Sequence, residues 1–380
     1  MTKQTLSFVH SEGAAEQQRV CAFARERCGL SAMVIYAQLW IGFSLYLYDH
    51  VSTPGWISLL LIGPYAAAML CMGKYLLFHA NGCDDPIVFA AGKKASRLFF
   101  ILLSISPLFD GFISFYALCA LIRDVMPDHS VWEGALAVAF TCAYSLGSGK
   151  ERALPHLGSF LKWIVGILLL YCFLIAIPHG KASHFFPLMG SGISSILKGS
   201  LWMCGSLSAA LWPLISAEPA EQVFHKQKAS FGFSSVFIAI LFALITYGVS
   251  IWLLPYYAMA RPHALGWRLL LVTHMTPSIP AWSLEVIALL LLLMLSLSVS
   301  IAHAAMTFSK GMGQKKEPRF LKPILLVLML PSCVIDTALT KQFIIYAAPW
   351  RGALSFLLTA ILCLLCIIRT HSRRIREEKA

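Results

Sequence analysis

Long apolar segments separated by short polar connections dominate the pattern of the chain. Each segment has about 20 mostly apolar residues, the length that an α-helix needs to cross the hydrocarbon core of a bilayer. Ten such segments are predicted, at residues 29–48, 54–78, 98–122, 131–147, 157–178, 193–215, 231–254, 282–308, 323–345 and 352–368. Because a helix satisfies its own backbone hydrogen bonds in lipid, the sequence predicts an all-α integral membrane protein.

The segments that flank the ten spans are polar. Residues 1–28 mix both charges and lack the apolar core of a signal peptide, so we expect them to be a cytoplasmic N-terminal tail. Residues 29–368 form the transmembrane domain, and residues 369–380 are expected to be a basic cytoplasmic C-terminal tail. Two connections, at 80–95 and 255–280, are long enough to hold short interfacial helices.

Composition and charge agree with a membrane protein. Hydrophobic residues make up 58% of the chain and charged residues 13%. With the N-terminus inside, most of the 30 Lys and Arg residues fall in cytoplasmic connections, and few, among them Lys181, Lys341 and Arg351, fall outside. This asymmetry predicts an even number of spans with both termini in the cytoplasm. The basic excess is thus explained by the membrane, and nucleic acid is not an expected partner.

Residue types that would indicate an enzyme are missing from the pattern. The 11 cysteines lie mostly in apolar stretches, and the one CxxC, at Cys363 and Cys366, lies in a run of Leu and Ile. Such cysteines are typical of core packing. The sequence has no Gly-rich phosphate loop and no His/Cys metal cluster, so we predict neither an enzyme activity nor a cofactor or metal.

Ten spans divide into five plus five, which would make the two halves inverted in the membrane, as in many transporters. The predicted repeats are residues 29–178 and 193–368. In such proteins, interrupted first helices of both halves form a ligand site at the midplane. Small residues in the middle of the sixth span, including Gly205 and Ser206, predict such an interruption. The alternative is that small residues permit close helix packing there.

Ionisable residues inside spans are candidates for chemistry, because a charge at the bilayer centre costs at least about 2.5 kcal/mol. Asp110 lies centrally in the third span, where it could bind a cation or a ligand amine, or carry a proton. Alternatively, it is a neutral, hydrogen-bonded acid that fixes helix packing. Gln38 and Gly42 lie at the corresponding depth of the first span. The other ionisable residues within spans include Glu285, His303 and Asp336.

Three stretches resemble a known family in their order and spacing. They are PGWISLLL at 54–61, AGKKASRLFF at 91–100 and FPLMGSGISSILKGS at 186–200. Together with the acidic position Glu285 and the number of spans, they are similar to the endospore germination permeases, the B subunits of nutrient germinant receptors. The resemblance extends over nearly the whole chain. The chain departs from the family by lacking a carboxylate in the middle of the sixth span.

This resemblance implies the fold of the amino acid, polyamine and organocation superfamily, with its inverted five-helix repeat. It also implies a midplane pocket for an amino acid or similar nutrient, and assembly with A and C subunits in the spore inner membrane. By position, the pocket would be formed by Gln38, Gly42, Asp110, Cys204, Gly205 and Ser206.

Three functions follow as hypotheses. The first is a sensor that binds a nutrient and passes a conformational change to partner subunits. The second is a secondary transporter that moves an amino acid or polyamine with protons or sodium, with Asp110 in the coupling role. The third is a membrane assembly subunit whose pocket is vestigial.

Overall fold

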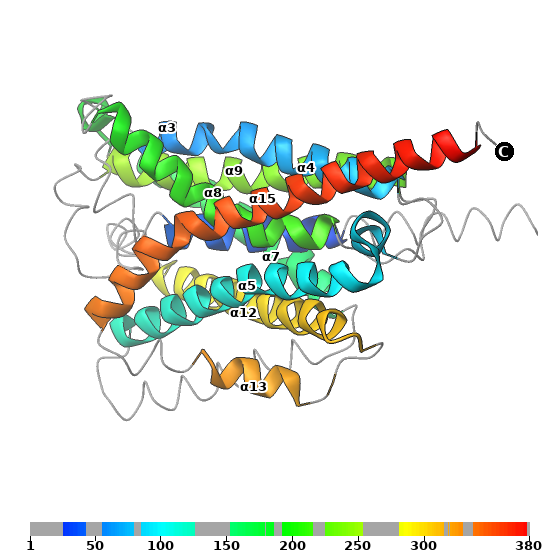
Figure 1. The fold of residues 1–380 in the computed structure, drawn as a ribbon. Coiled ribbons are helices and arrows are strands. Elements are labelled where there is room, and N and C mark those ends of the chain that lie inside the picture. The colour runs from blue at the N-terminus through cyan, green and yellow to red at the C-terminus, as the bar shows by residue number, and fades with distance from the viewer. Residues whose placement is uncertain are drawn as a thin grey trace, which may run out of the picture.

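The computed structural model describes residues 26–42, 55–79, 85–125, 153–178, 180–185, 192–215, 225–253, 281–314, 318, 320–329 and 337–377. All regular elements in these ranges are helical, and they pack as a bundle (Figure 1). Six helical stretches of the described residues are long and apolar enough to cross a membrane: Ile57–Leu76, which continues through a turn at Leu61, Pro86–Ile122, Ala153–Leu174, Phe233–Trp252, Ile287–Gly311 and Leu339–Ser372.

The helix over residues 26–42 lies in the interior of the bundle. From Ser31 to Gly42 every residue is buried, including large side chains such as Met33, Ile35 and Leu39. Because the residues are buried on every face, other parts of the protein, rather than lipid, surround this helix. The first half of the predicted first span is therefore a central helix surrounded by others.

The second and third predicted spans begin with short helical segments. α3 (Gly55–Leu60) is separated from α4 (Ile62–His79) by a turn at Leu61. Pro64 lies in the first turn of α4, where a helix tolerates a proline. α5 (Pro86–Val125) contains a break at Gly92, so a short segment at 86–91 precedes the long span. This segment falls in the connection for which an interfacial helix was predicted.

The middle of the chain follows the predicted order. Its described elements are α7 (Ala153–Ala176), the 3₁₀ turn η2 (Ala182–Phe185), α8 (Ile193–Ile215), α9 (His225–Leu253) and α12 (Ala281–Gly311). The predicted interruption of the sixth span is wrong, because α8 is an unbroken helix. Its small residue Gly205 instead lets α15 approach closely.

The predicted boundary between the last two spans is also wrong. α13 (Leu321–Val327) is short, and α15 (Thr337–Glu377) runs without interruption through residues 345–352, where a loop was predicted. The sequence here is typical of a loop, because it contains Pro349, Arg351 and Gly352. However, α15 accommodates the proline and buries the arginine. The helix also includes the first residues of the predicted C-terminal tail.

Two packing arrangements position the candidate site. α5 and α12 lie side by side, and α15 crosses α8 and α5 on its way to the C-terminus (Figure 1). A buried apolar cluster joins Leu76 of α4, Phe89 and Phe100 of α5, and Leu362 of α15. We call this side of the bundle the basic end, because exposed Lys74, Lys93, Lys94 and Arg369 lie there.

Several predicted elements lie outside the described residues. These are the span at 131–147, the connection at 255–280 and most of the N-terminal tail.

Candidate functional site

A buried ion pair lies at the centre of the bundle. The Arg351 guanidinium, through Nη1, contacts Oδ1 of Asp110. Asp110 lies midway along α5 and is 1% exposed, and Arg351 follows Pro349 in α15 and is 4% exposed. Two opposite charges at this depth stabilise one another, whereas either one alone would be costly.

The surroundings of Arg351 come from four helices. Its guanidinium carbon lies 5.5 Å from the centre of the Phe109 ring of α5. A Cβ atom added to Gly205 of α8 would lie 3.4 Å from its Nε atom. Tyr65 of α4 donates a hydrogen bond of 3.1 Å to the carbonyl oxygen of the next residue, Gly352. The guanidinium is thus enclosed between α4, α5, α8 and α15.

Some hydrogen-bonding capacity at this site is unused. Within the described residues, Nε and Nη2 of Arg351 are buried and have no acceptor. Buried polar groups in folded proteins are nearly always hydrogen-bonded, so free donors on a buried guanidinium indicate a place for an anionic or carbonyl group.

Gln38 links three helices next to the ion pair. Its Nε2 donates to Ser114 Oγ of α5 at 2.8 Å, to Ser296 Oγ of α12 at 3.0 Å and to the Asp110 carbonyl oxygen at 3.4 Å. The two serine hydroxyls also bond to each other at 3.0 Å. Gln38 Oε1 is buried and has no donor among the described residues. We call Gln38, Ser114 and Ser296 the Gln38 cluster.

The structure brings several predicted site residues together. Gln38 contacts the Asp110 backbone, and Asp110 reaches Arg351, which lies against Gly205. Gly42 packs on α8, since a Cβ there would lie 2.7 Å from the Trp202 ring. Cys204 is buried in the same turn of α8 as Gly205. Ser206 belongs to α8, but its side chain, like those of Glu285 and Asp336, lies outside the described residues.

Sequence reasoning missed Arg351. Its place beside Pro349 and Gly352 suggested an outer connection, although it is buried in the helix. The available signal was Asp110 itself, because a central carboxylate needs a positive partner inside the bundle. That partner is Arg351, one of the basic residues that the sequence pattern assigns to an outer connection.

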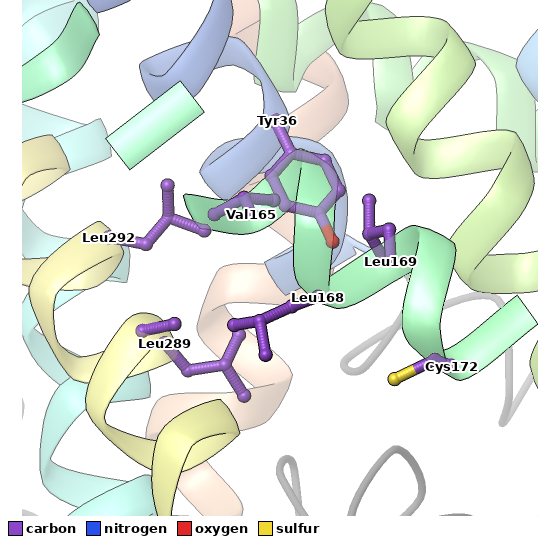
Figure 2. A pocket seen from close by; sticks show the side chains of 8 residues that line it. Tyr36, Val165, Leu168, Leu169, Cys172, Leu289 and Leu292 are labelled. Carbon is purple, nitrogen blue, oxygen red and sulfur yellow. The ribbon is translucent and has the colours of Figure 1, made fainter. Parts of the chain in front are cut away.

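A separate apolar pocket lies between the helix at 26–42, α7 and α12 (Figure 2). About 340 Å³ of space lies between its lining residues, and this figure includes space that is open to the surroundings. Its lining residues are Tyr36, Val165, Leu168, Leu169, Cys172, Ala288, Leu289 and Leu292. Figure 2 shows the Tyr36 ring directed into it, and the Tyr36 hydroxyl hydrogen-bonds with Thr246 Oγ1 at 2.8 Å. The pocket has no ion pair, so it differs in character from the Asp110–Arg351 site.

No group of three or more His, Cys, Asp or Glu side chains in the described part of the chain could hold a metal ion. At the centre, the described side chains of Asp110, Arg351 and Gln38 offer charges and hydrogen bonds.

Transporters are among the solved structures with a similar fold. A manganese transporter of Eremococcus coleocola matches with a TM-score of 0.54 and 13% identity, over 91% of this chain and 86% of its own. A nucleobase-cation-symport-1 family transporter, in a closed conformation with bromovinylhydantoin bound, matches with a TM-score of 0.57 and 12% identity, over 88% of this chain and 77% of its own. No protein-family model matches the sequence, and no curated protein matches it.

These similarities define the fold of the protein. It is a multi-pass membrane protein with the LeuT-like inverted-repeat transporter fold. The prediction of a helical, transporter-like fold is confirmed at this level.

Proposed function

We propose that this chain is the transporter-like sensing subunit of a spore nutrient germinant receptor. It binds an amino acid or similar small molecule between α5 and α15 and passes the resulting conformational change to A and C partner subunits in the spore inner membrane. Both of its termini lie in the cytoplasm. The proposal is supported by the three sequence stretches that resemble germination permeases and by the LeuT-like fold.

The observation that carries the proposal is the buried ion pair between Asp110 and Arg351. An amino acid carries an ammonium group and a carboxylate, which are the complements of these two side chains. Its carboxylate can accept from the free guanidinium donors, and its ammonium can donate to the Asp110 carboxylate and to Gln38 Oε1. The ligand thus replaces one internal ion pair by two external ones, so its binding separates α5 from α15.

A proton- or sodium-coupled transporter is the second candidate, and the similarity of the fold to transporters favours it. In that mechanism a coupling cation binds at Asp110. Arg351 already neutralises the Asp110 carboxylate, so a lone cation there would meet like-charge repulsion, whereas an amino acid brings a carboxylate for Arg351 together with its ammonium group. Ligand sensing without ion coupling is therefore favoured.

The first experiment measures ligand binding to the purified full chain in lipid nanodiscs. Thermal stabilisation is recorded with a panel of amino acids for the wild type, Asp110→Asn and Arg351→Lys. Arg351→Lys keeps the charge but loses the planar fork of donors. Thr359→Val is the matched control, because Thr359 is buried in α15 and its hydroxyl bonds to the Ser355 carbonyl of the same helix.

We expect one or a few amino acids to stabilise the wild type and the control, and neither site variant. Spores that carry either site variant should fail to germinate, which is measured by optical density, while membrane levels of the protein stay normal. Uptake of the stabilising amino acid into proteoliposomes would favour the transporter. Germination that survives both site variants would contradict the sensor and leave the assembly role with a vestigial pocket.

A further inference from the structure

A short helical segment at the basic end of the bundle is held at both of its ends. At its start, Asp85 Oδ1 accepts a hydrogen bond of 2.9 Å from the Ile87 backbone, and Oδ2 pairs with Lys310 Nζ of α12 at 2.9 Å. At its end, Arg369 Nη1 of α15 donates to the Phe89 carbonyl oxygen at 2.7 Å. The last carbonyls of a helix lack internal donors, so Arg369 acts as a cap.

The segment is joined to the long part of α5 by Gly92. This residue has φ 81° and ψ 164°, a backbone conformation that residues other than glycine rarely adopt. Arg369 Nη1 lies 3.6 Å from the position that a Cβ of Gly92 would occupy, and its guanidinium lies 5.9 Å from the Phe89 ring centre. Arg369 therefore caps the end of the segment and lies beside the Gly92 joint.

One helix connects this contact with the central ion pair. Arg351 and Arg369 both belong to α15, about five helical turns and about 27 Å apart, so they lie on the same face of the helix. The sequence between them contains no proline. Both guanidinium groups contact α5, Arg351 at Asp110 and Arg369 at Phe89. A displacement of α15 at the first contact is thus carried to the second.

We propose that Arg369 and the segment 85–92 are the output contact of the central site. Separation of Arg351 from Asp110 moves α15, takes Arg369 away from the Phe89 carbonyl and lets the segment turn about Gly92. This changes the surface that the chain presents at its basic end. The inference rests on the proposed function for the identity of the ligand, whereas the link between the two contacts can be tested without a ligand.

The test is hydrogen–deuterium exchange of the full chain in nanodiscs, followed in peptides that cover residues 85–92. Arg369→Gln should speed exchange there by about tenfold, because the cap is lost. Asp110→Asn should also speed exchange in these peptides, although it lies far from them. Asp110→Asn combined with Arg351→Gln breaks the pair without leaving a lone buried charge, so it decides the result if the single variant fails to fold. Thr359→Val should exchange like the wild type.

Faster exchange in the double variant, confined to segments that contact α15, would support the output contact. Unchanged exchange at 85–92 in the double variant, with faster exchange in Arg369→Gln, would overturn it and make Arg369 a static cap. In spores, Arg369→Gln should bind the nutrient normally and respond poorly. A normal response would also overturn the inference while leaving the proposed function intact. If the wild type binds no amino acid, the proposed function fails, and the exchange data still decide the coupling.

Discussion

Gly205 of α8 and Gly352 of α15 face each other where the two helices cross. A Cβ on Gly352 would lie 2.7 Å from the Cα of Gly205, and a Cβ on Gly205 would overlap the Ala348 carbonyl oxygen. Small residues at a crossing allow two backbones to approach closely in a membrane. This contact sets the depth at which Arg351, next to Gly352, meets Asp110.

Replacing Gly205 by Ala should therefore destabilise the protein. Overpacking costs about 1–3 kcal/mol, and we expect a loss of that size in the free energy of unfolding from a denaturing-detergent titration. Gly248→Ala in α9 is the control, since apart from neighbouring backbone of its own helix no atom lies within 4 Å of its added Cβ. Equal stability of the two variants would argue against the close crossing.

Removing one member of the central ion pair should cost more than removing both. Arg351→Gln leaves the Asp110 carboxylate buried without a positive partner, for which we expect a loss of about 3–5 kcal/mol in the free energy of unfolding. The double variant Asp110→Asn with Arg351→Gln should recover most of this loss. The same detergent titration is made on the wild type, the single variants Asp110→Asn and Arg351→Gln, and the double variant. These four values form a double-mutant cycle, which gives the coupling energy between the two side chains. A coupling near zero would contradict the pairing.

The Gln38 cluster should contribute to stability through its hydrogen bonds. Gln38→Leu removes the donor to both serines and to the Asp110 carbonyl, and we expect it to cost about 1–3 kcal/mol. Ser250→Ala is a suitable control because the Ser250 hydroxyl bonds to a carbonyl one turn back in α9. Stability measured for both variants checks the prediction, and an equal effect would show that Gln38 is not a structural link.

The orientation in the membrane can be tested by labelling. Lys94 at the basic end and Lys181 near η2 are both exposed. If the basic end is cytoplasmic, as the positive-inside rule requires, Lys181→Cys reacts with a membrane-impermeant maleimide in intact cells, and Lys94→Cys reacts only after lysis. The unsubstituted protein gives the background from native cysteines. The reverse pattern would invert the proposed topology.

The sequence was a good guide to the helices and a partial guide to the site. The range 193–215, predicted for the sixth span, coincides with α8, because a bilayer requires a long apolar helix whatever its neighbours are. Asp110 and Gln38 were recognisable as polar residues in apolar surroundings. Arg351 was not recognisable as a site residue, because it lies between Pro349 and Gly352, and proline, arginine and glycine close together are typical of a loop. Its role depends on Asp110, which is distant in sequence and adjacent only in the fold.

Pro349 divides α15 into two parts that can move relative to each other. Since proline has no amide hydrogen, the Ile345 carbonyl loses its donor within the helix, and the helix can bend there. The part before Pro349 includes Phe343, which packs edge-on against Phe109 of α5. The part after it carries both arginines. The part near Phe343 can thus move while the part with both arginines stays on α5, so that access to the central pair and signalling from it need not occur in the same step.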